Sequence, residues 1–169
     1  EVKEEIDNTS VFENGTNVGE IAKNLFGNYI NINFDSNLNN MIEETKIALK
    51  NKNSIITEAS FVYNNNFCSV DILKKNDNKY EIYEVKSSTH VNDIYLNDIS
   101  YQHYVLTSLG LKVTKASIVH LNTNYVRNGE LELDKLFIIN DVTEYVKSNL
   151  INVKNKIDEI NDYMNQKEE

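Results

Sequence analysis

The sequence predicts an α/β protein in which helices flank one mixed sheet, and three observations indicate this fold class. Helix-like and strand-like hydrophobic patterns follow one another in the order helices, three strands, helix and strand. Short polar turns separate the three consecutive strands, which therefore form a meander, and the next helix carries the chain to a further strand. The length of 169 residues is enough for one domain with a substantial core.

The N-terminal part predicts a polar start followed by two helices. Residues 1–10 are polar, and we expect them to be disordered. A first helix is expected at about 16–26, where apolar residues recur at helical spacing, and Gly27 is its expected end. A second helix follows Asp35 and ends in the polar stretch 50–53.

The middle of the chain predicts the meander and the helix after it. A helix is expected at 92–109, because Gly110 is a residue type that commonly follows a helix directly. The expected strands lie at 55–63, 67–75 and 80–87.

The C-terminal part predicts a strand at 112–121, a polar loop at 122–134, a short strand at 136–139 and one long amphipathic helix from 142 onward. This helix either packs on the core or a missing neighbour, or forms a coiled coil. The expected organisation is a disordered segment at 1–10, a core at 11–141 and a C-terminal amphipathic helix at 142–169.

Composition and charge restrict the classes of function. No apolar run approaches the roughly 18 residues needed to cross a membrane, and the start lacks the features of a signal peptide. The lone cysteine, Cys68, excludes an internal disulfide and an all-cysteine metal cluster. We therefore expect a cytoplasmic protein with no membrane partner. The net charge of −9 counts against simple nucleic-acid binding but is compatible with an acidic active site.

One predicted hairpin brings two acids together. If Asp77 and Asn78 form a two-residue type I′ loop, the register places Asp71 directly opposite Glu84. The same register pairs Val70 with Val85, Ile72 with Tyr83, Lys74 with Glu81, and Ser69 with Lys86.

Opposed carboxylates repel one another, so a cation is expected beside Asp71 and Glu84. Lys86, two residues along on the same face, offsets part of the repulsion, and Mg²⁺ would do so better. With a divalent ion and a nearby lysine, such a site is equipped to hydrolyse a phosphodiester. The alternative is a surface ion-pair cluster, and a one-residue bulge would break the facing geometry. The apolar neighbours of both acids count against that alternative.

At these residues the chain resembles the PD-(D/E)XK nuclease superfamily, whose signature is an acid on one strand and Asp/Glu-X-Lys on the next. Here these are Asp71 and the run Glu84-Val85-Lys86-Ser87-Ser88-Thr89, which is similar to the motif of RecB-like exonucleases and their CRISPR-associated relatives. Tyr101-Gln102-His103-Tyr104 resembles their glutamine motif. The resemblance covers roughly 15–141 and implies an αβββαβ restriction-endonuclease-like core with a mixed central sheet and flanking helices.

The resemblance also implies roles for individual residues. Asp71, Glu84 and the backbone carbonyl of Val85 would hold Mg²⁺ or Mn²⁺, Lys86 would be the catalytic lysine, and Gln102 would orient the site or contact DNA. The implied activity is hydrolysis of DNA, as an exonuclease acting on single strands or duplex ends. From its position alone, Gln102 is instead expected to be a solvated residue, as a glutamine on an amphipathic helix more often is.

The chain departs from the family pattern on the first helix. Many RecB-like members carry a histidine where this chain has Gly19, so that ligand is missing. Glu20 is a candidate replacement, against the alternative of an exposed acid favoured by the helix dipole. Glu58, an acid in an apolar strand, is a further candidate whose face the sequence leaves open.

Other residues receive structural interpretations. Cys68 is expected in the core, and His103 on a helix surface although it neighbours Gln102. Two small lysine groups, at 46–52 and at 112–115, are either phosphate contacts or solvated faces. The polar end of the last helix suggests further domains of a longer parent chain. Two rival functions remain: a catalytically silent nuclease-like scaffold or protein-interaction module, and an unrelated acidic binding domain.

Overall fold

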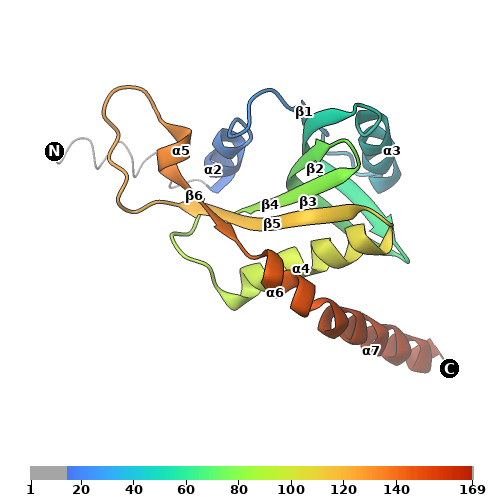
Figure 1. Cartoon of the computed structure of the whole chain (residues 1–169). Helices are drawn as coiled ribbons and strands as arrows, with labels where there is room; N and C mark the ends of the chain where they lie inside the picture. Colours follow the sequence, from blue (N-terminus) through green and yellow to red (C-terminus); the bar gives the residue numbers. More distant parts are fainter. Residues whose placement is uncertain (1–14, 169) are drawn as a thin grey trace.

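A six-stranded sheet with strand order β1-β2-β3-β4-β5-β6 forms the centre of the computed structural model, which describes residues 15–168 (Figure 1). The strands are β1 (Ile30–Asn31), β2 (Asn53–Tyr63), β3 (Asn66–Asn76), β4 (Lys79–Val85), β5 (Lys112–Leu121) and β6 (Phe137–Asp141). The helices are α2 (Gly15–Ala22), α3 (Leu38–Ala48), α4 (Asp93–Ser108), α5 (Leu133–Leu136), α6 (Thr143–Ser148) and α7 (Leu150–Glu168). The expected disordered segment 1–10 lies outside the described residues.

The sheet is mixed, as the sequence predicts. β2, β3 and β4 form the antiparallel meander, and β4 pairs in parallel with β5 after the α4 crossover. The two outer strands complete the sheet: β1 is parallel to β2, and β6 is antiparallel to β5. The α/β class is therefore confirmed, and within it the order α3-β2-β3-β4-α4-β5 follows the predicted succession.

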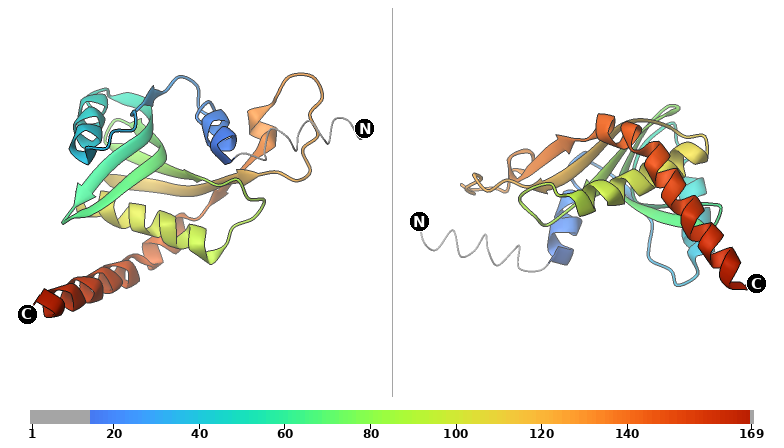
Figure 2. Two further views of the ribbon diagram at one scale, coloured as in Figure 1. Left: turned by 180° about the vertical axis from the view of Figure 1, so that it is seen from behind. Right: turned by 90° about the horizontal axis from the view of Figure 1, so that it is seen from below.

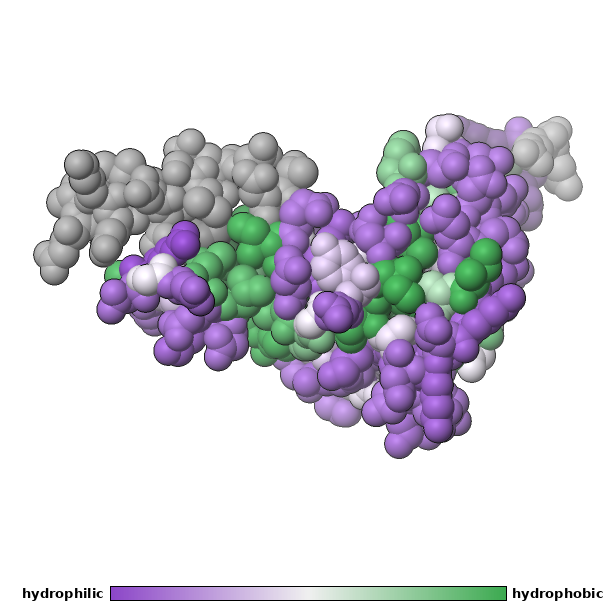
Figure 3. All heavy atoms as spheres, turned by 90° about the horizontal axis from the view of Figure 1, so that it is seen from above, coloured by the Kyte–Doolittle hydropathy of each residue, from purple (hydrophilic) through white to green (hydrophobic). Residues whose placement is uncertain are grey.

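Helices cover both faces of the sheet (Figures 1 and 2). α4 crosses one face and contacts β2, β3, β4 and β5, while α2 contacts β4 from the other side and α3 packs on β2. Two hydrophobic clusters result, one that includes residues of α4 such as Val105 and Leu106, and one that joins Val18 and Ala22 of α2 to Tyr83. Hydrophilic residues cover most of the face seen from above, with smaller hydrophobic groups between them (Figure 3).

Capping residues explain where the longer helices begin. The side chain of Asn37 accepts a hydrogen bond from the backbone N–H of Asn39 at the start of α3. Asn92 does the same for Tyr95 at the start of α4, which leads from the end of β4 back across the sheet. Asparagine is a favoured N-cap because its side chain satisfies a donor that the first turn leaves free.

The two hairpin turns differ from each other in backbone conformation. Asn64 and Asn65 both have positive φ angles, of 47° and 64°, as a type I′ turn requires. In the β3–β4 hairpin Asn76 pairs with Lys79, so the predicted two-residue loop at Asp77 and Asn78 is confirmed. Only Asp77 has a positive φ, of 56°, so the predicted type I′ conformation of that loop is wrong. The predicted register nevertheless forms along the half of the hairpin next to the turn (its lower half), with Ile72 opposite Tyr83 and Lys74 opposite Glu81.

Three features of the fold differ from the sequence prediction. β1 and α5 were not predicted, because two and four residues are too short to show a periodicity. The predicted single C-terminal helix is two helices, α6 and α7, divided at Asn149, whose backbone stays close to helical (φ −89°, ψ −4°). α7 packs partly on α4, and its far end extends away from the sheet (Figure 2). Among the described residues, no helix has the length and hydropathy that crossing a membrane requires.

Candidate active site

The candidate site lies where β3 and β4 stop pairing. The ladder between them ends at Ile72 and Tyr83, one residue short of the predicted Asp71–Glu84 pair. At this point the Asp71 side chain takes the place of a backbone acceptor. Its Oδ2 accepts a hydrogen bond from the backbone N–H of Val85 at 2.8 Å. The predicted pairs beyond this point, Val70 with Val85 and Ser69 with Lys86, are therefore wrong.

Glu84 is held on the α4 side of the sheet. Its side chain is buried, with 9% of the residue exposed, and Gln102 of α4 donates a hydrogen bond from Nε2 to Glu84 Oε2. The ammonium of Lys86 lies 3.4 Å from the other carboxylate oxygen, Oε1. Gln102 is itself 6% exposed, so the alternative of a solvated glutamine is wrong.

Lys86 is positioned by α4 as well as by Glu84. Its Nζ lies 2.9 Å from Asp98 Oδ2 and 4.9 Å from the centre of the Tyr95 ring. The sequence analysis did not single out Asp98. It precedes Gln102 by four residues, so the two share one helix face, and this spacing was the signal that could have identified it.

Burial and mutual repulsion shift the protonation of the two acids. Burial, the charge of Glu84 and the charge of Glu58 together raise the pKa of Asp71 from its ordinary 3.8 to about 8, although the Val85 hydrogen bond and the charge of Lys86 act to lower it. Burial also raises the pKa of Glu84, against the hydrogen bond from Gln102 and the charge of Lys86. For Lys86, burial alone would lower the pKa, but Asp98 and Glu84 raise it above its ordinary value. Without a further cation, the paired carboxylates therefore resist ionisation.

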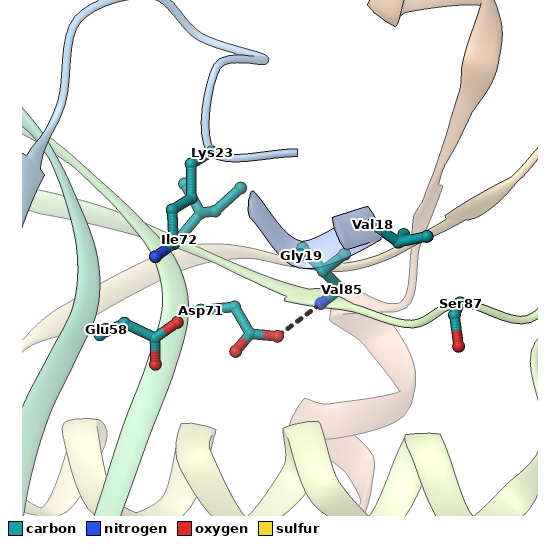
Figure 4. Close-up of a pocket in the computed structure, with 8 residues that line it drawn as sticks. All are labelled: Val18, Gly19, Lys23, Glu58, Asp71, Ile72, Val85 and Ser87. Carbon is teal, nitrogen blue, oxygen red and sulfur yellow. Dashed lines mark hydrogen bonds between the residues drawn. The ribbon is translucent and has the colours of Figure 1, made fainter. Parts of the chain in front are cut away.

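A cavity of about 200 Å³ opens beside Asp71 on the α2 side. Figure 4 shows the Asp71 carboxylate directed to the Val85 nitrogen, with Glu58 beside it and Lys23, just after the end of α2, reaching toward Glu58. The cavity is lined by Val18, Gly19, Lys23, Glu58, Asp71, Ile72, Val85 and Ser87.

Lys23 is a buried cation that the sequence analysis missed. It is 7% exposed, and its Nζ donates to Glu20 Oε1 at 2.8 Å and to Asn31 Oδ1 at 3.0 Å. Thr57 of β2 donates to the same Asn31 oxygen at 2.8 Å, so the short strand β1 fixes Lys23 over the cavity. Lys23 is the first residue after α2, and Gly19 of α2 lines the same cavity.

The remaining candidates, Glu20, His103 and Cys68, do not line this cavity. The side chain of Glu20 is 62% exposed and paired with Lys23, and Glu20 does not line the cavity. His103 is 3% exposed, so its predicted helix-surface position is wrong, and burial lowers its pKa. Cys68 is buried in the core, as predicted.

The acids do not by themselves complete a metal cage. Within residues 15–168, no three or more His, Cys, Asp and Glu side chains are arranged to hold a metal ion. A cation at Asp71 and Glu84 would therefore need oxygen from backbone, amide or water groups as well, which is the usual manner of Mg²⁺ binding.

The chain matches no protein-family model, no curated protein and no solved structure.

Proposed function

We propose that this protein is a divalent-metal-dependent nuclease that hydrolyses phosphodiester bonds in DNA. In this proposal the strands and helices from α3 to β5 form a restriction-endonuclease-like core. Asp71 and Glu84 bind the cation with the backbone carbonyl of Val85, and Lys86 is the catalytic lysine. The observation that carries the proposal is the convergence of the partly buried Asp71, the buried Glu84, a lysine and a glutamine where β3 and β4 separate.

The donor groups at this point suit Mg²⁺ or Mn²⁺. Gln102 is buried, and its Oε1 has no hydrogen-bond partner, although the same amide donates to Glu84. An unpartnered buried acceptor is costly and calls for a donor or a cation nearby. Carboxylate and amide oxygens are the ligands that these hard cations prefer.

The raised pKa of Asp71 supports the same proposal. The pKa of Asp71 is raised from 3.8 to about 8 because its surroundings disfavour the charged form of the carboxyl group, and the charge of Glu84 adds to this effect. Strongly shifted acids with a specific charged neighbour are frequent at functional sites. A divalent cation would remove the penalty on both acids together.

The chain's own residues supply the rest of the chemistry. When bound, the cation would polarise a phosphoryl oxygen and lower the pKa of a water molecule. Lys86 would stabilise the negative charge that develops as water adds to phosphorus and a P–O ester bond breaks. Asp98 and Tyr95 hold the Lys86 ammonium in place, and Gln102 holds the Glu84 carboxylate.

A cleavage assay tests the proposal. The purified chain is incubated with labelled linear and circular DNA, in Mg²⁺ or Mn²⁺ and in a chelator, beside Asp71→Asn. We expect metal-dependent cleavage that the substitution abolishes, with linear DNA degraded and circular duplex spared, as an exonuclease requires. Metal binding without cleavage would indicate a silent nuclease-like scaffold. If the chain neither binds metal nor cleaves DNA, the result would favour an acidic binding domain whose charges form ion pairs only.

A further inference from the structure

Glu58 has a backbone conformation that is unusual for a glutamate inside a strand. Its φ angle is +59°, in the left-handed region that only glycine, and occasionally asparagine or aspartate, adopts readily. The residues on both sides keep the regular β2–β3 register, with Thr57 opposite Ile72 and Ala59 opposite Val70. The irregularity is therefore confined to the point where Glu58 lies opposite Asp71.

The side chain of Glu58 enters the same space as that of Asp71. Both residues line the cavity of about 200 Å³ (Figure 4). Ser69 Oγ lies 3.4 Å from Glu58 Oε2, and the buried ammonium of Lys23 acts on Glu58 by its charge. Glu84 is held on the α4 side by Gln102 and does not line this cavity, so Glu58 and Glu84 approach Asp71 from different sides.

Backbone strain of this kind is usually found at residues whose side chains have a functional role. A left-handed conformation at a residue other than glycine costs free energy, and such residues gather at active sites and ligand-binding positions. An acid with only a structural role could lie in a regular strand. In that geometry the hydrogen-bond ladder would continue between Glu58 and Asp71.

We propose that Glu58 is a positioning residue of the Asp71 site, whose carboxylate accepts hydrogen bonds from water molecules bound to the cation. This inference rests on the proposed function. Mg²⁺ and Mn²⁺ keep several water ligands when few side chains bind them. A cavity of about 200 Å³ has room for a few water molecules at about 30 Å³ each. Outer carboxylates of this type orient the water ligands and strengthen metal binding.

Glu58→Gly distinguishes a structural role of Glu58 from a role in positioning the water ligands of the cation. Glycine tolerates the positive φ and removes a partly buried acid, so without metal the melting temperature should equal or exceed that of the unsubstituted protein. The Mn²⁺ dissociation constant, followed by electron paramagnetic resonance of the free ion, should rise about 10–100-fold. Glu58→Gln, which keeps the shape and loses the charge, should weaken Mn²⁺ binding to a similar degree.

Asn65→Gly is the matched control, because Asn65 has a positive φ of 64° in a turn remote from the cavity residues. It should leave the Mn²⁺ dissociation constant unchanged. Mn²⁺ binding by Glu58→Gly as tight as in the unsubstituted protein would overturn the role of Glu58 while leaving the proposed function in place. If the unsubstituted protein shows no Mn²⁺ binding that depends on Asp71, the proposed function and the role of Glu58 both fail.

Discussion

The Asp71 carboxylate accepts the backbone N–H of Val85 at 2.8 Å, so a side chain of β3 binds the main chain of β4 at the end of their ladder. This contact fixes the Asp71 carboxylate beside the Glu84-Val85-Lys86 segment. It also leaves the second carboxylate oxygen free to bind a ligand. The site is thus built into the sheet and does not depend on a mobile loop.

Stability without metal should fall as pH rises. The folded state raises the pKa of Asp71 from 3.8 to about 8, so between these values the folded protein binds more protons than the unfolded chain. Where the folded state holds the extra proton, the free energy of unfolding decreases with increasing pH. Chemical denaturation in a chelator across this range should show the decrease.

Asp71→Asn should reduce this pH dependence, leaving the part that comes from the raised pKa values of Glu84 and Glu58. The asparagine oxygen can still accept the Val85 N–H, and the buried charge is gone. Near pH 8 we expect the variant to be more stable than the unsubstituted protein by about 1–3 kcal/mol in the absence of metal. An unchanged pH profile in this variant would show that Asp71 ionises as freely as an exposed acid.

Lys86→Met should separate catalysis from metal binding. Removing the ammonium leaves the acids without their lysine, so Mn²⁺ binding should be unchanged or tighter. The cleavage rate should fall about 10²–10³-fold, because the positive charge no longer stabilises the transition state. Lys135→Met, which removes an exposed lysine paired only with Glu132, is the control. A cleavage rate unaffected by Lys86→Met would exclude Lys86 from the reaction.

Gln102→Leu should weaken both the fold and the cation site. Glu84 would lose its α4 donor, which costs about 1–3 kcal/mol when the remaining group is buried. Mn²⁺ affinity should also fall about 10–100-fold, as for other residues that orient metal ligands. Thermal shift with and without Mn²⁺ measures both effects. A variant that loses stability but keeps its Mn²⁺ affinity would assign Gln102 a packing role only.

Gly19→His should add a ligand to the site. A Cβ atom at Gly19 would meet no other atom within 4 Å, and Gly19 lines the cavity that contains Asp71. Histidine also has a higher helix propensity than glycine, so the variant should fold at least as well. We expect tighter Mn²⁺ binding, measured by titration at a pH where the imidazole is neutral. Mn²⁺ binding no tighter than in the unsubstituted protein would show that a side chain at position 19 does not bind the cation.

The sequence predicted the parts of the fold that depend on local pattern. The lower half of the β3–β4 hairpin has the predicted register because Ile72–Tyr83 and Lys74–Glu81 are favourable cross-strand pairs. The upper half could not be predicted, because the Asp71 side chain takes the Val85 N–H and ends the ladder. Competition between a side chain and the backbone for one donor leaves no periodicity in a sequence.

The same limit applies to the site. Glu84 and Lys86 were expected together from their spacing, but Asp98 reaches the site from α4 and Lys23 from the turn after α2, both remote in the sequence. The left-handed backbone of Glu58 was equally beyond prediction, because glutamate rarely adopts this conformation and nothing in its residue type signals it.

The position of a bound cation tests the central claim most directly. In a crystal soaked with Mn²⁺, the anomalous signal should lie within about 2.0–2.6 Å of one carboxylate oxygen of Asp71 and one of Glu84. A Mn²⁺ ion bound elsewhere on the chain, with these two carboxylates left without a cation at saturating Mn²⁺, would contradict the account.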